Sequence, residues 1–274
     1  MKFENLNGLM IPKIGFGTWR IGGEAAPNPA IEEASLAALH SAVELGYTHF
    51  DTAEYYAGGH AEELLAQTML DLRVKRESLF ITSKVSPEHL RDKDVRKACE
   101  NSLRRLKTEF IDLYLIHWPN PLIKLEETFQ ALNQLRREGK IRHIGVSNFK
   151  LRDLKKAVSL CESHLLTNQV PYSLPASEYV KNGVIEYCQQ NEILITAYTP
   201  VKFRNLTVNK VIKDIADRHQ ATPFQIALAW LVAQPSVITI PMSFDALHQK
   251  QNLEAAEIDL SVEEMSLLGQ LYIK

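Results

Sequence analysis

Apolar residues occur along the chain in short, near-continuous runs, separated by segments in which they recur every three or four positions. Near-continuous runs are typical of parallel strands buried on both faces, and the three-and-four spacing is typical of helices. The expected strands cover residues 13–19, 49–53, 79–85, 111–118, 141–147, 165–170, 193–199 and 237–243. The clearest expected helices cover 30–46, 96–107, 125–139 and 224–234.

Eight strand–helix units without a break predict a (β/α)8 barrel, an α/β fold. The alternative is an open doubly wound sheet, which normally has a GxGxxG turn after its first strand. Here "GFGTW" is followed by "RIGG", which does not match that pattern. Two short extended pieces around Asn7-Gly8 predict a β-hairpin ahead of the barrel. No linker or low-complexity tract interrupts the chain, so we expect one domain over residues 1–274.

Composition and charge narrow the function class. The 274 residues are 45% hydrophobic and 23% charged, which suits a globular protein, and the net charge of −2 gives no argument for nucleic acid or an anionic membrane. No run approaches the roughly 18–20 apolar residues of a membrane span. Cys99, Cys161 and Cys188 lack CxxC spacing, which argues against disulfides and a zinc site. The N-terminus lacks a signal-peptide pattern, so we expect a cytoplasmic protein.

Catalytic side chains in a barrel come from the carboxyl ends of the strands. The polar residues at those ends are Asp51, Lys84, His117, Ser147, Asn148, Gln169, Tyr198, Thr199 and Ser243. The first three are ionisable, and all would point toward one mouth of the barrel.

Each ionisable residue also has a purely structural interpretation. Lys84 could have reached solvent at the strand tip, and His117 could be a hydrogen-bonded core histidine. Asp51 could cap the next helix. Together, and with Tyr55 and Tyr56 close by in "HFDTAEYY", the three residues indicate a proton-transfer site instead.

The chemistry of these residue types supports that hypothesis. A tyrosine has an ordinary pKa of about 10, too high for an efficient acid at neutral pH. We expect the neighbouring ammonium of Lys84 to lower that pKa, and the carboxylate of Asp51 to hold the ammonium. A neutral His117 can donate a hydrogen bond to a substrate oxygen. Such a site protonates an oxygen on which negative charge develops.

The sequence resembles the aldo-keto reductase family. The motifs "GFGTW", "GYTHFDTAEYY", "ITSKV", "DLYLIHWP", "GKIRHIGVSNF", "NQVPY", "TAYTP" and "VITIP" occur in the family's order and at similar separations, over essentially the whole chain. The resemblance implies reduction of an aldehyde or ketone by hydride from NAD(P)H. It also implies a catalytic tetrad of Asp51, Lys84, His117 and a tyrosine five positions after the aspartate, which is Tyr56 and not Tyr55.

The resemblance further implies where the cofactor binds. The nicotinamide would lie against Tyr198, with its amide held by Ser147, Asn148 and Gln169. The implied cofactor contacts also include Thr18, Trp19, Asp51, Thr199, Pro200 and Val201, the last three along the pyrophosphate.

The 2′-phosphate region departs from the family's pattern. Members that favour NADPH usually carry a lysine and an arginine where this chain has Met242 and His248. Ser243 and Asn252 match the pattern, and Gln251 replaces a usual glutamate. Two cations that would hold a phosphate are absent, although Lys250 or a protonated His248 could compensate. The expected cofactor is NADP(H), slightly favoured over NAD(H).

The substrate side has short loops, because little chain follows His117 and Tyr198 before the next expected element. Loops set specificity in this fold. We expect an open pocket walled by Trp19, Tyr55 and Trp118, with His117 also in contact with the substrate, which resembles the small prokaryotic-type reductases. Small aldehydes, ketoaldehydes or keto sugars are the expected substrates, and a monomer is the expected state.

Two other functions stay open. A nicotinamide-binding accessory or sensor protein would need no lysine beside a tyrosine, so an intact tetrad argues against it. A metal-dependent hydrolase would need convergent His and Asp ligands, and His117 is not part of an HxH motif. No metal is therefore expected.

Overall fold

The structure, a computed structural model, describes residues 2–174, 176, 178–201 and 206–272. The chain divides into two compact units: a first unit of residues 16–168, and a second unit of residues 1–15 with 169–274. That the two form a single domain stays a prediction.

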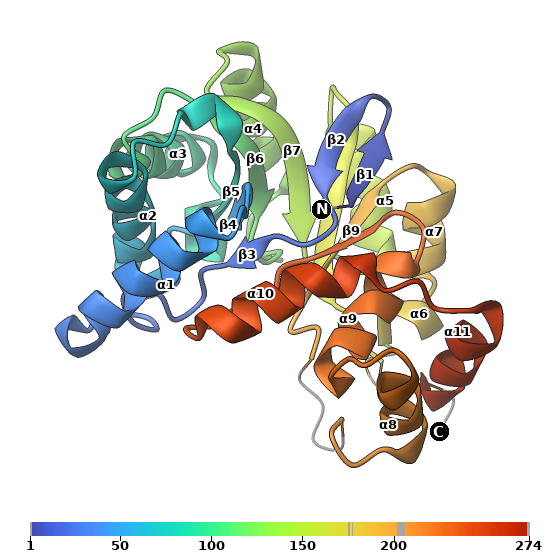
Figure 1. The fold of residues 1–274 in the computed structure, drawn as a ribbon. Helices are drawn as coiled ribbons and strands as arrows, with labels where there is room; N and C mark the ends of the chain where they lie inside the picture. Colours follow the sequence, from blue (N-terminus) through green and yellow to red (C-terminus); the bar gives the residue numbers. More distant parts are fainter. Residues whose placement is uncertain (1, 175, 177, 202–205, 273–274) are drawn as a thin grey trace. The chain divides into compact units, whose positions relative to one another are not determined.

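The first unit is a parallel sheet with helices between its strands (Figure 1). Its strands are β3 (Phe16–Gly17), β4 (His49–Asp51), β5 (Phe80–Val85), β6 (Ile111–Ile116) and β7 (Ile141–Ser147). Its helices are α1 (Glu32–Glu44), α2 (His60–Asp71), α3 (Asp92–Leu106), α4 (Leu125–Arg137) and α5 (Leu151–Leu160), with short 3-10 helices η1 (Pro29–Ile31), η2 (Tyr56–Gly59), η3 (Arg76–Ser78) and η4 (Pro87–His89). Each strand pairs with the next along the chain, as the strand–helix alternation predicts.

The register of this sheet brings Asp51 and Lys84 to one face. Asp51 pairs with the residue two before Lys84, and Lys84 pairs with Leu115, which pairs with Gly145. Because side chains alternate along a strand, Asp51, Lys84, Leu115 and Gly145 lie on the same face. That face is densely packed: a Cβ at Gly145 would lie 2.5 Å from Leu115 Cδ2. Glycine is therefore required there by the close packing of the core.

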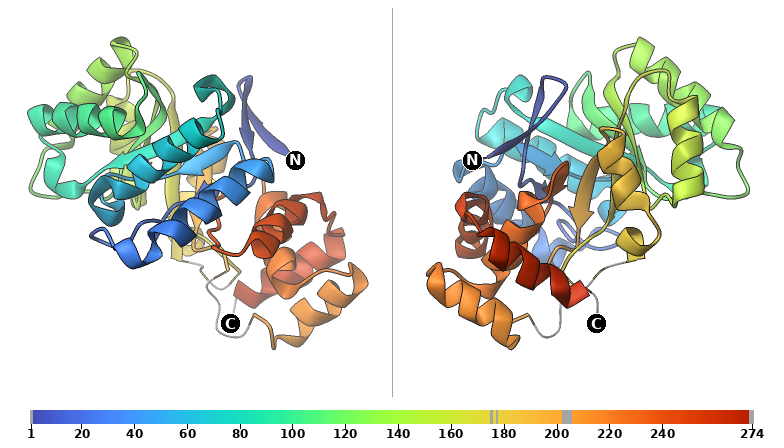
Figure 2. Two further views of the ribbon diagram at one scale, coloured as in Figure 1. Left: turned by 60° about the vertical axis from the view of Figure 1, so that its left-hand side comes forward. Right: turned by 90° about the vertical axis from the view of Figure 1, so that its right-hand side faces the viewer.

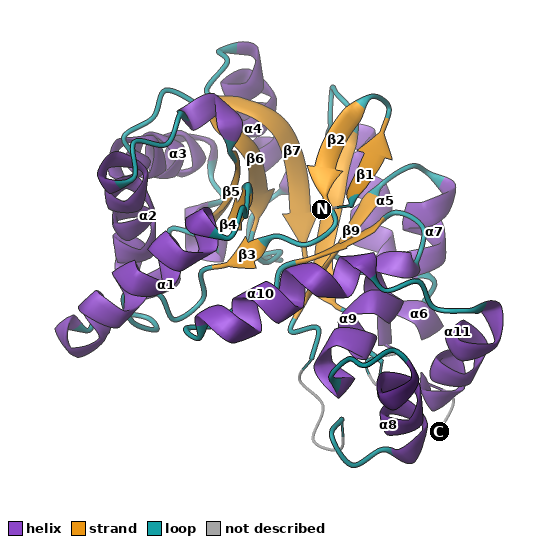
Figure 3. Ribbon diagram, in the orientation of Figure 1, coloured by secondary structure: helices purple, strands orange, loops and turns teal. Residues whose placement is uncertain are grey.

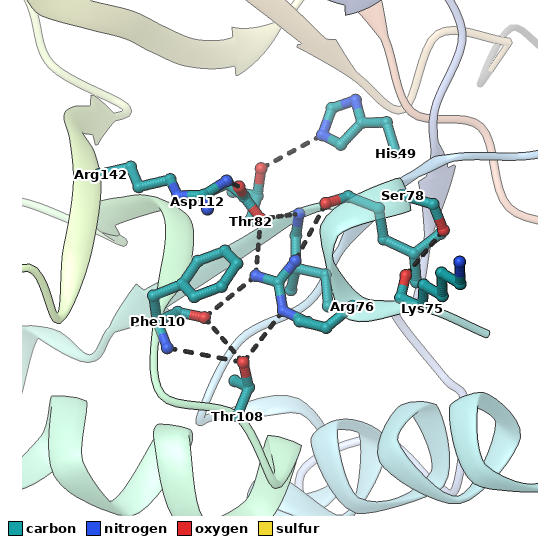
Figure 4. A network of polar contacts seen from close by, with 11 residues as sticks. His49, Lys75, Arg76, Ser78, Thr82, Thr108, Phe110, Asp112 and Arg142 are labelled. Atoms are coloured by element: carbon teal, nitrogen blue, oxygen red, sulfur yellow. Dashed lines mark hydrogen bonds and ion pairs between the residues drawn. The ribbon is translucent and has the colours of Figure 1, made fainter. Parts of the chain in front are cut away.

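A separate polar network joins the amino ends of the strands, away from the carboxyl ends that carry Asp51 and Lys84 (Figure 4). Arg76 donates to Asp112 at 2.6 Å and to the carbonyl of Phe110 at 3.0 Å. Arg142 pairs with the other oxygen of Asp112 at 2.9 Å, and both guanidinium groups lie over the Phe110 ring. The network holds together the starts of β6 and β7, on the side of the sheet where a barrel carries stability and not catalysis.

The second unit contains the predicted hairpin and the remaining helices (Figures 2 and 3). Strands β1 (Phe3–Leu6) and β2 (Leu9–Pro12) are antiparallel, and Asn7 and Gly8 between them both have positive φ, as a tight hairpin turn requires. Strands β9 (Leu194–Tyr198) and β10 (Val237–Thr239) are parallel. The helices are α6 (Glu178–Lys181), α7 (Val184–Gln190), α8 (Lys210–Arg218), α9 (Pro223–Ala233), α10 (Ala246–Glu254) and α11 (Val262–Gly269), with η5 (Ala255–Glu257) and η6 (Gln270–Tyr272).

Strand β8 (Leu165–Pro171) contains the point where the two units divide, and the hydrogen-bonded order of β3 to β10 is their order in the sequence. The segment just before β3 also pairs with the last strand. Thr239 donates to the Lys13 carbonyl at 2.9 Å, and Gly15 donates to the Thr239 carbonyl at 2.8 Å. Within the second unit, this pairing adds a short parallel segment beside β10.

Several strands are shorter than expected. Strand β4 ends at Asp51 and not at residue 53, and β10 ends at Thr239 and not at residue 243. In both places the sequence stays apolar or small while the chain leaves the sheet, so the apolar pattern runs past the strand. Among the described helices, none combines the length and apolar character needed to cross a membrane.

Candidate active site

Lys84 and Asp51 form a buried ion pair at the ends of neighbouring strands. Lys84 lies on β5 and Asp51 is the last residue of β4, and their side chains are 0% and 2% exposed. The ammonium also donates to the Thr52 carbonyl at 2.8 Å. The alternative of a solvated lysine at a strand tip is therefore wrong. So is the helix-cap alternative for Asp51, because Gly59 is the residue at the N-cap of α2.

Tyr56 approaches the same ammonium from the loop after β4. Its Oη lies 3.2 Å from Lys84 Nζ, and the ammonium is 4.8 Å from the centroid of the ring. The chain reaches this position through a left-handed turn, in which Ala57, Gly58 and Gly59 have φ of 50°, 62° and 95°. A left-handed alanine is strained, and here Ala57 N donates to the Glu24 carbonyl at 2.6 Å.

His117 follows the last residue of β6, and its ring faces Tyr56. The two ring centroids are 5.6 Å apart with the planes at 75°. No described residue hydrogen-bonds to the imidazole, so the alternative of a hydrogen-bonded core histidine does not hold. Burial, together with the Lys84 charge, lowers the pKa of His117 to about 3. The ring is therefore neutral at physiological pH and has an N–H to donate.

The pKa of Tyr56 departs from the expectation. Burial raises the pKa of Tyr56 above its ordinary value and outweighs Lys84, which acts in the lowering direction. The expected net lowering is thus wrong, because sequence reasoning weighed the charge but not the desolvation of the phenolate. Burial alone would lower the pKa of Lys84, but Asp51 and Tyr56 outweigh it and raise that pKa. At neutral pH the phenol is protonated and the lysine charged.

Two exposed aromatic side chains contact this group, and a third, Trp118, follows His117 in the chain. Trp19, Tyr55 and Trp118 are 40%, 47% and 49% exposed. Trp19 stacks on Tyr55 with the planes 10° apart, and its edge meets the Tyr56 ring at 5.1 Å between centroids. Tyr55 also meets His117 edge-on. Exposed aromatic surface beside buried titratable groups is suited to binding a small organic molecule.

Other predicted residues of the first unit lie around the same groups. Asn148 Nδ2 donates to Ser147 Oγ at 2.9 Å and to the His117 carbonyl at 3.1 Å, and Asn148 itself has a φ of 65°. Thr18 N donates to the Asp51 carbonyl at 2.9 Å. Thr18 Oγ1 is buried and finds no hydrogen-bond partner among the described residues. A buried hydroxyl without a partner is costly, so this atom fits a contact with a bound polar group.

Comparison with known proteins decides the family. The sequence model of the Aldo/keto reductase family matches residues 13–273. The chain is 37% identical over 270 residues to the methylglyoxal reductase YeaE of Escherichia coli (strain K12), covering 96% of this chain and 92% of that protein. The chain belongs to the aldo/keto reductase family. It is an oxidoreductase, and the predicted class of NAD(P)H-dependent carbonyl reductases is confirmed.

Solved structures agree with this assignment. A thermostable aldo-keto reductase, Tm1743, solved with the inhibitor epalrestat, has a TM-score of 0.94 and 45% identity, covering 99% of this chain and 100% of that one. A Klebsiella pneumoniae aldo/keto reductase in complex with NADP and acetate has a TM-score of 0.88 and 36% identity, covering 99% and 96%. The predicted (β/α)8 barrel with an N-terminal hairpin is thereby confirmed.

The remaining residues expected at the reductase's cofactor belong to the second unit. Gln169 is buried on β8 and Tyr198 is the last residue of β9. Thr199 has a φ of 49°, and Pro200 and Val201 follow it. The segment 202–205 lies outside the described residues.

The residues expected around the 2′-phosphate lie at or near α10. Met242 and Ser243 precede the helix, and His248, Gln251 and Asn252 lie on it. Asp245 is its N-cap, and its carboxylate accepts from His248 N at 3.1 Å. Ser243 Oγ accepts from Asp245 N at 3.0 Å. Sequence reasoning missed Asp245, although an aspartate three residues before His248 at a helix start is a capping pattern.

Sequence reasoning also missed Glu54. Its Oε1 accepts from Ser86 N at 2.7 Å and lies 2.9 Å from His89 Nδ1. The only signal was position, because Glu54 stands between Asp51 and Tyr56 in the sequence. Among the described residues, no group of three or more His, Cys, Asp or Glu side chains could hold a metal ion.

Proposed function

We propose that Tyr56 is the general acid of this reductase and that Asp51, Lys84 and His117 complete the catalytic group. The observation that carries the proposal is the 3.2 Å separation of Tyr56 Oη from Lys84 Nζ, with Lys84 ion-paired to Asp51. A phenol next to a fixed ammonium can release a proton to a developing alkoxide, because the ammonium stabilises the phenolate that remains.

Each residue has a separate part in this mechanism. The nicotinamide supplies the hydride to the carbonyl carbon when bound. Tyr56 Oη gives its proton to the carbonyl oxygen, and Lys84 stabilises the resulting phenolate. Asp51 keeps the ammonium charged and in position. His117, neutral because burial lowers its pKa to about 3, donates a hydrogen bond that orients the substrate oxygen.

The proposed cofactor contacts are those expected from the sequence. In the first unit these are Thr18, Trp19, Asp51, Ser147 and Asn148; in the second they are Gln169, Tyr198, Thr199, Pro200, Val201, Met242, Ser243, His248, Gln251 and Asn252. The buried, unpartnered hydroxyl of Thr18 supports this assignment. NADP(H) is the slightly favoured cofactor, and the NADP complex of the Klebsiella pneumoniae relative supports that choice.

The proposed substrate is a small aldehyde or 2-oxoaldehyde. The exposed wall of Trp19, Tyr55 and Trp118 can contact a short carbon chain beside the acid. Relatives are named methylglyoxal reductase in Escherichia coli and glyoxal reductase in Bacillus subtilis, which supports the same size class. A monomer, a cytoplasmic location and the absence of nucleic-acid binding stay predictions.

The test is steady-state oxidation of NADPH and NADH with methylglyoxal and with an aromatic aldehyde. We expect turnover in the wild type, and a Tyr56→Phe variant that loses about 10²- to 10⁴-fold in kcat while still binding cofactor. Quenching of tryptophan fluorescence measures the binding of the cofactor. A Tyr56→Phe enzyme of undiminished rate would exclude Tyr56 as the acid.

A further inference from the structure

Glu54 connects the segment that carries Tyr56 to the segment that carries Lys84. It precedes Tyr56 by two residues, and its hydrogen-bond donor Ser86 follows Lys84 by two. The carboxylate side chain is only 9% exposed. The carboxylate is therefore a mostly buried group that the mechanism above does not use, two residues before Tyr56 and hydrogen-bonded to the residue two after Lys84.

The hydrogen bonds between these segments show what the carboxylate does. Past the end of β4, Thr52 N donates to the Thr82 carbonyl at 2.8 Å, and Glu54 N donates to the Lys84 carbonyl at 3.3 Å. The next backbone donor on the β5 side, Ser86 N, has the Glu54 carboxylate as its acceptor. The side chain thus extends the pairing of the two segments by one hydrogen bond after the backbone has left the sheet.

The backbone leaves the sheet at this point in order to turn. Tyr55 has helical φ and ψ of −74° and −29°, and Ala57 to Gly59 follow in the left-handed region. A strained turn persists only when its surroundings hold it. The Glu54–Ser86 hydrogen bond holds the amino end of this turn against the segment that follows Lys84.

We infer that Glu54 is a positioning residue for proton transfer: through Ser86 N it fixes the Tyr56 turn so that the phenol stays within hydrogen-bond distance of Lys84. The inference rests on the proposed function, because it assigns Glu54 a part in presenting the acid. It acts through the backbone and touches neither substrate nor cofactor. Misplacement of a reacting group by about 1 Å can cost about 10²-fold in rate.

The experiment compares three changes to this hydrogen bond in the full-length enzyme. Glu54→Ala removes the acceptor. Glu54→Gln keeps an acceptor oxygen of the same reach. Ser86→Pro removes the donor, and the φ of −68° at Ser86 already suits proline. We expect Glu54→Ala and Ser86→Pro each to lower kcat by about 10- to 100-fold with an unchanged Kd for cofactor, and Glu54→Gln to stay within about threefold of wild type.

Two further variants separate this hydrogen bond from its neighbours. Glu88→Ala removes an exposed carboxylate from the same loop and should leave kcat unchanged. His89→Ala removes the second partner of Glu54 Oε1 while leaving Ser86 N in place, and should stay within about threefold. The double variant Glu54→Ala/Ser86→Pro should lose little more than either single variant, because both remove one interaction.

The outcomes discriminate clearly. A Glu54→Ala enzyme with wild-type kcat, a Glu54→Gln enzyme as impaired as Glu54→Ala, or fully multiplicative losses in the double variant would each overturn the inference. If Glu54→Ala does not fold, the comparison of Glu54→Gln with Ser86→Pro decides alone. If the wild type reduces the aldehyde and Tyr56→Phe does not, the proposed function holds. The Glu54 and Ser86 variants then test the role of Glu54 alone. A wild type without turnover would overturn the proposed function and this inference with it.

Discussion

Lys84 and Asp51 pair across two adjacent strand ends with both side chains out of contact with water. Removing one partner of a buried pair leaves an uncompensated charge, which costs about 3–5 kcal/mol. We therefore predict that Asp51→Asn lowers the free energy of unfolding by about 3 kcal/mol and kcat by about 10²-fold. Urea denaturation and steady-state kinetics measure the two effects.

A double variant provides the control for the charge argument. Asp51→Leu/Lys84→Met replaces the whole pair by apolar side chains and should be more stable than Asp51→Asn, although inactive. If the double variant is the less stable of the two, the loss in Asp51→Asn comes from packing and not from the isolated ammonium.

The pH dependence of the reaction follows from the shifted pKa values. His117 has a pKa of about 3, and the pKa values of Tyr56 and Lys84 are raised above their ordinary values. On the proposed mechanism carbonyl reduction needs a protonated Tyr56, and the pKa of Tyr56 lies above its ordinary value of about 10, so kcat/KM should stay flat through neutral pH and fall only above about pH 10. Alcohol oxidation needs the phenolate, so its rate should instead rise with pH. A reduction rate that already falls between pH 7 and 8 would contradict this prediction.

Gly59 ends the turn that presents Tyr56, and a side chain there would meet the guanidinium end of Arg105. A Cβ there would lie 2.5 Å from Arg105 Nε, and the residue has a φ of 95°. We predict that Gly59→Ala lowers the free energy of unfolding by about 1–3 kcal/mol and also lowers kcat, because a Cβ strains the left-handed backbone of the turn and pushes on Arg105, which is ion-paired with Glu62. Thermal melts and kinetics measure both quantities.

Gly46 is a matched control for Gly59. It has a φ of 94°, and no described residue beyond its chain neighbours lies within 4 Å of the position that a Cβ would occupy. Gly46→Ala should therefore cost only the backbone strain of about 1 kcal/mol and leave kcat unchanged. Equal kinetic losses in the two variants would show that turn geometry next to Tyr56 is not responsible.

Cofactor choice should respond to the two positions that lack a cation. The double variant Met242→Lys/His248→Arg supplies charge-assisted donors for a phosphate, so we predict at least a tenfold rise in the kcat/KM ratio of NADPH over NADH. Lys250→Met tests whether that lysine already compensates, in which case the wild-type ratio should fall. An unchanged ratio in both variants would mean that the 2′-phosphate is held elsewhere.

The sequence predicted the order of the strands and the gathering of Asp51, Lys84 and His117 at one edge because both depend on local pattern, whereas the choice of Tyr56 over Tyr55 came from the family resemblance. Near-continuous apolar runs identify buried parallel strands, and a polar residue that ends such a run lies at the same edge as the others. The same reasoning overran β4, because Thr52 and Ala53 are small and buried although they lie outside the strand. The apolar pattern indicates which residues are buried, and residues can stay buried after the hydrogen bonding between strands has ended.

Other features depend on contacts that no local pattern contains. Glu54 looks like a solvated loop residue until Ser86, more than thirty positions away, is brought to it. The net direction of the Tyr56 pKa depends on how much water the folded chain removes from the phenol, which a list of neighbouring charges does not give. Both require the three-dimensional surroundings.

The backbone pairing of residues 13–15 with Thr239 has a consequence for the order in which the protein forms during synthesis. Strands β3 to β7 find their partners among near neighbours in the sequence, so they can assemble as soon as they leave the ribosome. This pairing joins segments more than two hundred residues apart, and synthesis must have passed Thr239 before it can form. Folding should therefore finish with a slow, non-local step, long after the segment containing Asp51, Tyr56, Lys84 and His117 has emerged.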